Sequence, residues 1–315
     1  MQHFTSIKDV LDLSALVKTA AAFKKDSFAM PDLGKQKTLG MLFFNSSLRT
    51  RLSTQKAAQN LGMQVIVMNV GTDGWALETE EGVIMNQGKA EHIKEAAAVI
   101  GQYCDILGVR SFANLKNQKE DYEEKVLQNF IKYAGVPVVS LESATLHPLQ
   151  SLTDLLTINL NKKIEKPKVV LTWAPHPKAL PQAVANSFSE WMLKSEVEFV
   201  ITHPKGYELS KNFTEGAIIT NNQDEAFKNA DFIYAKNWSA YNDYGKILSQ
   251  DENWMITKEK MALTNEAFFM HCLPVRRNVI VSDDVIDNDK SLVIEQAGNR
   301  EFAAQAVLKE MVIKL

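Results

Sequence analysis

Short apolar runs alternate with amphipathic segments along the whole chain, and this alternation constrains the fold more than any other feature. We expect strands at residues 38–44, 63–69, 104–110, 137–142, 168–174, 197–203, 217–220, 232–236, 267–274 and 291–297. Strands that alternate with helices form parallel sheets covered by helices on both faces. The predicted fold class is therefore α/β, and because 315 residues exceed the size at which single cores stop growing, we expect two doubly wound parallel-sheet domains sharing a cleft.

The boundary between these domains is predicted just ahead of a helix that begins near Pro148. We assign residues 1–143 to a first domain and residues 144–298 to a second. The remaining residues, 299–315, are expected to form a C-terminal helix that packs back on the first domain.

Composition excludes several classes of protein. A net charge of −3 gives no basic footprint for nucleic acid, and no apolar run is long enough to span a bilayer. The first residues, MQHFTSIKDVLDL, lack the basic and then apolar order of a signal peptide. The two cysteines, Cys104 and Cys272, have no metal-binding or disulfide-framework spacing. We expect a soluble cytoplasmic protein without metal or disulfides.

The stretch 46-SSLRTR-51 directly follows the first apolar run and opens a helix. The N-terminus of a helix binds anions, because its unpaired N–H groups and its dipole both favour negative charge. Two serines, a threonine and two arginines are more donors than a helix cap needs, which favours a phosphate. The glycines and the Gly-Lys-Ser/Thr ending of a P-loop are absent, so ATP is disfavoured as the phosphate source.

Polar side chains at the carboxyl ends of the other predicted strands are the remaining site candidates, because ligands bind there in parallel sheets. They are Arg110, Glu142, His147, Gln150, His176, Lys178, Lys236, His271, Cys272, Asn299 and Arg300. Each has an alternative reading: Arg110 could form a structural ion pair, His147 could cap its helix, and the run 276-RRN-278 could be a solvated face. Cys272 could be a nucleophile, although a carbonyl-lined pocket before Pro274 fits the sequence better.

Three motifs taken together, 46-SSLRTR-51, 147-HPLQSLTD-154 and 271-HCLP-274, resemble the transcarbamylase family. In that family Ser-x-Arg-Thr-Arg, His-Pro-x-Gln-x-Leu-x-Asp and His-Cys-Leu-Pro occur in this order over a chain of this length. The resemblance covers essentially the whole chain. It implies a carbamoyl-phosphate domain, an amino-acid domain, a homotrimer with active sites at subunit interfaces, and no metal or organic cofactor.

The resemblance also implies roles for individual residues. Arg110, His147, Thr50 and Cys272 would act in catalysis. The residues that would surround carbamoyl phosphate are Ser47, Leu48, Arg49, Thr50, Trp75, Arg110, His147, Gln150, Cys272, Leu273 and Arg300. An amine attacks the carbamoyl carbon, and donors around its oxygen stabilise the negative charge that develops there.

Departures from the family patterns indicate the second substrate. The chain has 234-YAKNWSAY-241 where ornithine transcarbamylases carry Asp-x-Trp-x-Ser-Met-Gly, and Lys236 would repel a free α-ammonium group. The Arg-x-Gln-x-Glu-Arg segment of aspartate transcarbamylase is also missing. The chain resembles N-acylornithine transcarbamylases, with a substrate site at Glu142, His176, Lys178, Lys236, Ala90, Leu273, Pro274 and Arg276.

One loop position favours N-succinylornithine over N-acetylornithine as that substrate. Acetyl-specific members of the family tend to carry a glutamate where this chain has Ala90, and a glutamate would repel a succinyl carboxylate. His176 and Lys178 are expected to supply the counter-charge. The alternatives are an ordinary ornithine transcarbamylase and a non-catalytic regulatory protein that only binds carbamoyl phosphate.

Overall fold

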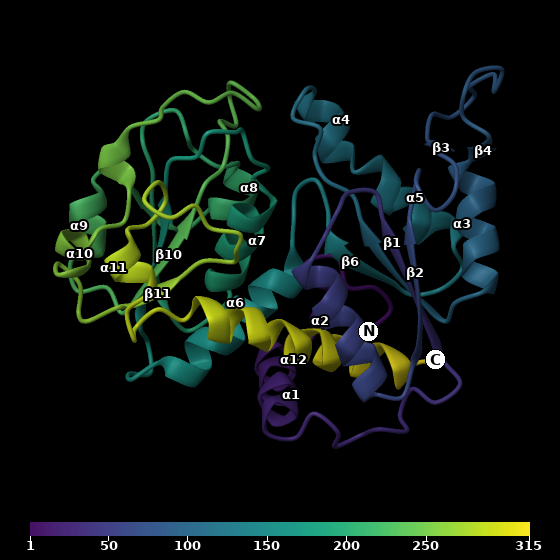
Figure 1. The fold of residues 1–315 in the computed structure, drawn as a ribbon, viewed down its shortest axis with the longest axis horizontal. Coiled ribbons are helices and arrows are strands. Elements are labelled where there is room, and N and C mark those ends of the chain that lie inside the picture. The colour runs from purple at the N-terminus through teal and green to yellow at the C-terminus, as the bar shows by residue number, and fades with distance from the viewer. The chain divides into compact units, whose positions relative to one another are not determined.

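The structure is a computed structural model that describes residues 1–315. The chain divides into two compact units. Unit 1 comprises Met1–Asn114, Lys119–Leu149 and Arg300–Leu315, and unit 2 comprises Leu115–Gln118 and Gln150–Asn299. Each unit contains a parallel sheet with helices around it (Figure 1), as the alternation of apolar and amphipathic segments predicts.

The sheet of unit 1 has the strand order β2-β1-β5-β6. Its strands are β1 (Thr38–Phe43), β2 (Gln64–Asn69), β5 (Ile106–Arg110) and β6 (Val138–Glu142), and every pair is parallel. The chain first places β2 on one side of β1 and later places β5 on the other. The strand order therefore reverses between β1 and β5, which is where an open α/β sheet binds its ligand.

Helices and a short second sheet complete unit 1. The helices are α1 (Leu13–Lys25), α2 (Arg49–Asn60), α3 (Ile93–Gln102), α4 (Gln118–Glu123), α5 (Lys125–Tyr133) and a 3-10 turn η1 (Ile7–Asp9); the strands are β3 (Leu77–Glu78) and β4 (Glu91–His92). Helices α3 and α5 lie side by side (Figure 1) and bury Ile93, Ala97 and Phe130 in one core with Leu107 of β5.

The sheet of unit 2 has the order β11-β10-β7-β8-β9. Its strands are β7 (Lys168–Trp173), β8 (Glu198–Thr202), β9 (Ile218–Thr220), β10 (Phe232–Lys236) and β11 (Phe268–Met270), all in parallel pairs. The order reverses between β7 and β10, so the second ligand-binding edge is expected after Trp173 and Lys236.

The helices of unit 2 are shorter except at its two ends. They are α6 (Pro148–Asn161), α7 (Ala183–Met192), α8 (Lys211–Thr214), α9 (Gln223–Phe227), α10 (Lys258–Met261), α11 (Asp283–Ile286), α12 (Val293–Val312) and a 3-10 turn η2 (Glu252–Trp254). Helices α6 and α12 each have residues in both units. Pro148 occupies the first turn of α6, where its missing N–H leaves no helical bond unmade.

Nine of the ten predicted strands are confirmed, with ends displaced by a few residues, but the strand predicted at 291–297 is wrong. That stretch begins α12, and only Ser291 forms an isolated bridge, to Phe269. The buried residues Val293, Gln296 and Arg300 recur every three or four positions, which is the helical period. The short apolar run could not be told from a strand because its polar members are also buried.

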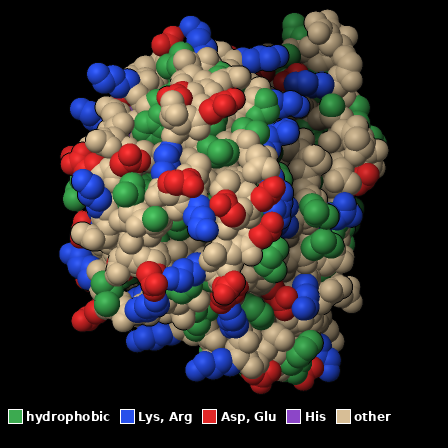
Figure 2. Space-filling view, turned by 60° about the vertical axis from the view of Figure 1, so that its left-hand side comes forward, with side chains coloured by type: hydrophobic (Ala, Val, Ile, Leu, Met, Phe, Trp, Pro, Cys, Tyr) green, Lys and Arg blue, Asp and Glu red, His purple; other side chains and the backbone are tan.

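The visible surface has mixed charge. Figure 2 shows Lys and Arg side chains interspersed with Asp and Glu over one face, without a large area of one sign. Among the helices, none combines the length and the apolar character that crossing a membrane requires.

Candidate active site

The loops that follow β1 and β5 are joined where the strand order of unit 1 reverses. Asn45, after β1, accepts a hydrogen bond at Oδ1 from the backbone N–H of Phe112, after β5, at 2.7 Å. Helix α2 then begins at Arg49, so its first N–H groups lie at this same edge. The predicted helix N-terminus is confirmed, and it has the local geometry of an anion site.

Two arginines from distant parts of the chain converge on the hydroxyl of Thr50. Arg110 Nη1 donates to Thr50 Oγ1 at 2.9 Å, and Arg300 Nη2 donates to the same oxygen at 2.6 Å. A hydroxyl has two acceptor positions and one hydrogen. Because the two guanidinium groups occupy both acceptor positions, the Thr50 O–H is left to donate, which orients it as a donor before any ligand is present.

Glu142 balances part of the positive charge around Thr50. Its Oε2 lies 3.2 Å from Arg110 Nη2 and 3.5 Å from His147 Nε2. All three side chains are buried. Glu142 has φ of 149°, and β5 and β6 change register between Val109 and Arg110, so the backbone departs from a regular sheet at this carboxylate. Arg49, Arg110 and Arg300 carry three positive charges against the one negative charge of Glu142. The net charge of this cluster therefore suits a dianion.

The electrostatics of Arg110 reflect these neighbours. Burial lowers the pKa of its guanidinium, Glu142 opposes that change, and the nearby positive charge of Arg49 adds to it. Its guanidinium carbon also lies 4.4 Å from the centre of the Phe112 ring, a cation–π contact. Arginine stays charged even when buried, so the site keeps a fixed cation. Arg110 can therefore form an ion pair with Glu142 in the protein without ligand and still serve as a cation that binds a ligand.

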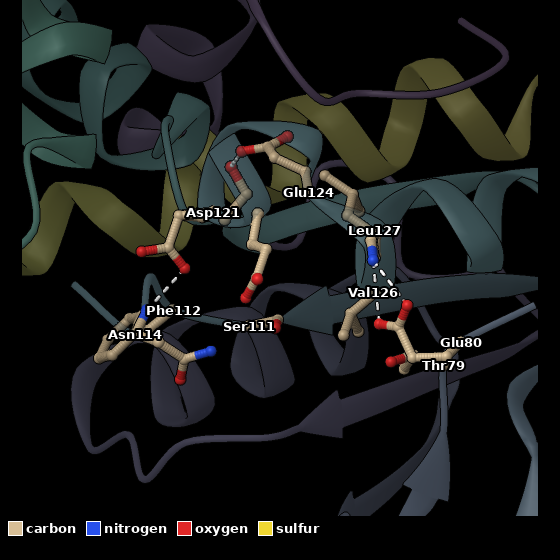
Figure 3. A pocket seen from close by; sticks show the side chains of 13 residues that line it. Thr79, Glu80, Ser111, Phe112, Asn114, Asp121, Glu124, Val126 and Leu127 are labelled. Carbon is tan, nitrogen blue, oxygen red and sulfur yellow. Dashed lines mark hydrogen bonds and ion pairs between the residues drawn. The ribbon is translucent and has the colours of Figure 1, made fainter. Parts of the chain in front are cut away.

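A pocket of about 140 Å³ lies beside these loops, and its lining argues against anion binding there (Figure 3). It is bordered by Glu80, Glu120, Asp121 and Glu124, with Lys125 as its one cation. Glu124 accepts from Ser143 and Thr145, Asp121 accepts from the backbone N–H of Asn114, and Glu80 pairs with Lys125. These carboxylates fix the surrounding loops, and a phosphate would be repelled by them.

Some predicted residues of unit 1 lie outside the Thr50 cluster. Ser47 and Leu48 precede α2 without a side-chain cap on it. Trp75 is 59% exposed and donates from Nε1 to Glu91 at 2.8 Å, next to the exposed Ala90. Hydrogen bonds from Asn69 lower the pKa of the Asp73 carboxyl, and the positive charge of Arg51 adds to this effect. Trp75 and Ala90 belong to the loop around β3 and β4.

Unit 2 gathers basic side chains at the edge where its own strand order reverses. His176 follows β7, Lys236 ends β10, and Arg276 follows β11. Arg276 Nε donates to His176 Nε2 at 3.0 Å, and His176 Nδ1 lies 2.9 Å from the carbonyl oxygen of Lys178. Since an arginine can only donate, Nε2 carries a lone pair, while Nδ1 lies near both the carbonyl oxygen of Lys178 and the backbone N–H of Lys178, which donates to it at 3.0 Å.

A ring that accepts at Nε2 is neutral, so of the two residues expected to supply counter-charge, Lys178 is the cation in this arrangement. Burial lowers its pKa first, and the charges of Arg276, Lys236 and Lys178 lower it further. The cations of this cluster are Arg276, Lys236 and Lys178, with His176 fixing the direction of the Arg276 side chain. Residues 276–278 are all exposed, and within that run Arg276 is tied to this edge by its bond to His176.

A buried polar network lies at the start of α6 and reaches the 271–273 segment. Gln150 Nε2 and Gln296 Nε2 both donate to Asp154 Oδ1 at 2.7 Å. Gln296 Oε1 accepts from the backbone N–H of His271 at 3.0 Å, and His271 Nδ1 accepts from the backbone N–H of Leu273 at 2.9 Å. Leu273 has φ of 53° and a cis bond to Pro274.

Asp154 and Gln296 belong to this network but were not among the residues that the sequence predicted for the site. Asp154 follows Gln150 by four residues on a helix, which is the spacing of facing side chains and could have revealed it. Gln296 could not be found, because its segment was predicted as a strand. Cys272 is a free, buried thiol that lies against the fully buried Tyr234. No group of three or more His, Cys, Asp and Glu side chains could hold a metal ion.

Comparison with known proteins connects this geometry to a family. Residues 2–160 match the family model described as aspartate/ornithine carbamoyltransferase, carbamoyl-P binding domain, and residues 181–311 match the Asp/Orn binding domain of the same family. The chain is 56% identical to N-succinylornithine carbamoyltransferase of Bacteroides fragilis over 100% of both chains. It is 34% identical to N-acetylornithine carbamoyltransferase of Xanthomonas campestris, over 99% of this chain and 98% of the relative.

Solved structures agree with the sequence comparison. An N-acetyl-L-ornithine transcarbamylase with a glutamate-to-alanine change, complexed with carbamyl phosphate and N-succinyl-L-norvaline, is similar with a TM-score of 0.93 at 34% identity, covering 99% of this chain and 100% of that one. An acetylornithine transcarbamylase complexed with acetylcitrulline has the same TM-score and identity, covering 99% of each chain. Strand order, arginine cluster and family models point the same way: the chain belongs to the aspartate/ornithine carbamoyltransferase family.

Proposed function

We propose that this protein transfers the carbamoyl group of carbamoyl phosphate to the δ-amine of N-succinyl-L-ornithine, giving N-succinylcitrulline and phosphate in arginine biosynthesis. We infer carbamoyl phosphate as the first substrate from the convergence of Arg110 and Arg300 on Thr50 at the N-terminus of α2. We infer N-succinyl-L-ornithine as the second substrate from the set of three cations around neutral His176.

Carbamoyl phosphate fits unit 1 through its charge and its carbonyl. The phosphate would lie at the turn from Ser47 to Thr50, where helix N–H groups and Arg49 face a dianion. The Thr50 hydroxyl, Arg110 and His147 would donate to the carbonyl oxygen. As the amine attacks the carbamoyl carbon, negative charge grows on that oxygen and these groups stabilise it without having to reorganise. The bond between the carbamoyl carbon and the phosphate oxygen then breaks, the leaving phosphate takes the proton that the amine loses, and Arg49 compensates its remaining charge.

Glu142 would have to release Arg110 and His147 when the substrates bind. In the protein without ligand, its carboxylate lies against both the Arg110 guanidinium and the His147 ring. Once carbamoyl phosphate replaces it there, Glu142 would face the amine substrate. This agrees with its predicted place at the substrate end of the site.

Gln150 would act as an acceptor, which refines its predicted role as a donor to the carbonyl. Its Nε2 is bound to the acceptor-only carboxylate of Asp154, so Oε1 is turned the other way. The carbamoyl amide group offers N–H donors that match this oxygen. The backbone carbonyls of Cys272 and Leu273 would similarly accept from the attacking δ-amine, and this gives Cys272 a role that does not need its thiol.

The charges of the amine substrate match those of unit 2, because the acylated end of N-succinylornithine carries carboxylates and no ammonium group. Free ornithine would bring its α-ammonium group toward Arg276, Lys236 and Lys178, and like charges repel. N-succinylornithine has an amide in place of that ammonium and carries two carboxylates. Three cations therefore match it better than they match free ornithine or N-acetylornithine.

The relatives agree with the succinyl preference. The proteins named N-succinylornithine carbamoyltransferase are 56% identical, against 34% for the one named N-acetylornithine carbamoyltransferase. In solved N-acetyl-L-ornithine transcarbamylases, N-succinyl-L-norvaline is bound in variants that replace one glutamate by alanine, proline, valine or serine. Ala90 stands where the family comparison places a glutamate in acetyl-specific members, which removes the same repulsion.

We further propose a homotrimer whose sites lie at subunit interfaces. Large apolar side chains of unit 1 are more than half exposed in the single chain: Leu48, Leu52, Trp75 and Ile84. They belong to the start of α2 and to the loop around β3 and β4. Exposed apolar side chains of this size are expected at a contact with another subunit. A neighbouring chain would thus receive Trp75 and Ala90 in its site.

One assay tests the substrate assignment. Purified protein is given carbamoyl phosphate with N-succinyl-, N-acetyl- or free ornithine at equal concentration, and the citrulline-type product is measured. We expect the highest kcat/KM with N-succinylornithine. Turnover of free ornithine alone would overturn the argument from the cation cluster, and no turnover with any amine would favour a protein that only binds carbamoyl phosphate.

A further inference from the structure

Asp154 is a fully buried carboxylate on α6 whose two glutamine contacts come from α6 itself and from α12. It has no exposed surface, and its Oδ1 accepts from Gln150 and Gln296 at 2.7 Å each. Burying a carboxylate is costly unless donors compensate it. A neutral side chain would fill this space at lower cost, so the charge calls for a reason beyond packing.

The carboxylate determines which way two amide groups point. An ionised carboxylate accepts hydrogen bonds and cannot donate them, so each glutamine must turn its NH₂ group to Asp154 and its oxygen away. Gln296 uses that oxygen to accept from the backbone N–H of His271 at 3.0 Å. Gln150 is left with its oxygen on the side away from Asp154. Both bonds end on Oδ1, so a side chain at residue 154 without an acceptor oxygen could impose neither orientation.

The second arm of the network reaches the backbone of residues 271–273. Gln296 holds the His271 N–H, and the His271 ring in turn holds the Leu273 N–H at 2.9 Å. Leu273 has φ of 53°, a conformation that costs energy for a residue other than glycine and persists only where its surroundings fix it. The position of the Cys272 and Leu273 carbonyls thus depends on Gln296, and the amide of Gln296 depends on Asp154.

We propose that Asp154 is a positioning residue that sets two acceptor groups at once: the Gln150 oxygen for the carbamoyl group and the Cys272 and Leu273 carbonyls for the attacking amine. The assignment of those two ligands rests on the proposed function. Asp154 touches neither ligand itself. Its effect on turnover is exerted through Gln150 on one side and Gln296 on the other.

Two substitutions separate this role from a structural one. Asp154→Leu keeps the branching of the side chain but has no acceptor oxygen, so both amides lose their fixed direction; we expect about a tenfold weaker affinity for carbamoyl phosphate and about a 100-fold lower kcat. Gln296→Met cuts only the arm to His271. It should raise KM for N-succinylornithine about tenfold and leave carbamoyl-phosphate affinity within about twofold of wild type.

Ser189→Ala is the matched control. Ser189 is fully buried on α7 in the same unit, and its hydroxyl donates to the backbone carbonyl of Ala185 at 2.8 Å. Its loss should lower thermal stability and leave kcat within about twofold, because a merely structural change in this core does not redirect the amides.

The measurements are titration calorimetry with carbamoyl phosphate, steady-state kinetics with N-succinylornithine and thermal unfolding, on wild type and all three variants. Loss of affinity in Asp154→Leu together with the selective KM effect of Gln296→Met supports the proposal. Wild-type constants in Asp154→Leu, or equal effects of Gln296→Met on both ligands, would overturn it. Should Asp154→Leu not fold, the selectivity of Gln296→Met decides alone. An inactive wild type would instead refute the proposed function.

Discussion

At the scale of single residues, the Thr50 hydroxyl is the most tightly specified group of the anion site. Two guanidinium groups occupy its acceptor positions, so its hydrogen has one direction left in which to act. Sequence alone identified Thr50, Arg110 and Arg300 as candidates. It could not show that they meet on one oxygen, because Arg300 comes 250 positions after Thr50 in the chain.

Thr50→Val removes that hydroxyl and keeps the shape of the side chain. We expect kcat to fall about 100-fold, the usual cost of losing one preorganised donor. Thr54→Val is the control, because Thr54 is equally buried one turn later on α2. Carbamoyl-transfer kinetics on both variants check the prediction, and equal losses in the two would show that the hydroxyl of Thr50 has no special role.

His203 predicts a pH dependence of stability. It is buried, its Nδ1 lies 2.8 Å from the carbonyl oxygen of Pro204, and burial lowers the pKa of its ring. The unfolded chain, with a histidine pKa of about 6.5, binds this proton more readily than the folded protein does. The stability that the neutral ring contributes is therefore complete above about pH 6.5 and is lost as pH falls toward the lowered folded pKa.

His203→Phe should make the unfolding free energy fall less steeply between pH 7 and pH 5. Phenylalanine can keep the edge contact that His203 makes with Trp238, and it has no proton to bind. Urea unfolding at several pH values measures this slope. A slope unchanged from wild type would assign the acid sensitivity to other groups.

At the scale of elements, strands were easier to predict than helices. Buried strands such as β7 read as continuous apolar runs, because parallel sheets are covered on both faces. Residues 291–297 were mistaken for a strand, and the polar residues Gln296, Asn299 and Arg300, buried on one side of α12, explain why. Periodicity reveals a helix when its buried residues are apolar and its exposed residues are polar. Polar residues on the buried side remove this difference.

Helices α3 and α5 approach each other at a glycine, which gives a paired test. A Cβ on Gly101 would lie 1.9 Å from the carbonyl oxygen of Ala134. We expect Gly101→Ala to destabilise the protein by about 1–3 kcal/mol, because backbone must move.

The matched change is Gly298→Ala, on α12, where a Cβ meets nothing within 4 Å. It should stabilise the protein by up to about 1 kcal/mol, since alanine loses less freedom than glycine in a helix. Denaturant unfolding compares the two variants. Effects of the same sign would contradict the close contact between α3 and α5.

At the scale of the whole molecule, the fold class could be predicted from the alternation of elements, while the chemistry required the site motifs. The two reversals of strand order explain where those motifs act, since one gathers Thr50 and Arg110 and the other gathers His176, Lys236 and Arg276. Neither reversal is visible in sequence, because strand order depends on pairing. The neighbours of His176 could not be predicted for the same reason, because Lys178, Lys236 and Arg276 follow or end three different strands.

Subunit mixing tests the proposed trimer. Arg110→Ala and Trp75→Ala should each be nearly inactive alone. After dissociation and reassembly together, we expect activity to return, because a mixed trimer can place an intact Arg110 beside a neighbour's intact Trp75. Ultracentrifugation should give a mass three times the 35.3 kDa of the chain. Mixed trimers without activity would place each site within one subunit.

Unit 2 is almost entirely one insertion, Gln150–Asn299, into the sequence of unit 1. The hydroxyl at residue 50 meets its second guanidinium only at residue 300, the first residue after that insertion. During synthesis on the ribosome, the sheet of unit 1 can therefore assemble early, whereas its anion site stays incomplete until the other unit has been translated. A nascent chain therefore cannot complete the site for carbamoyl phosphate in unit 1 before unit 2, which would bind the amine, has been synthesised.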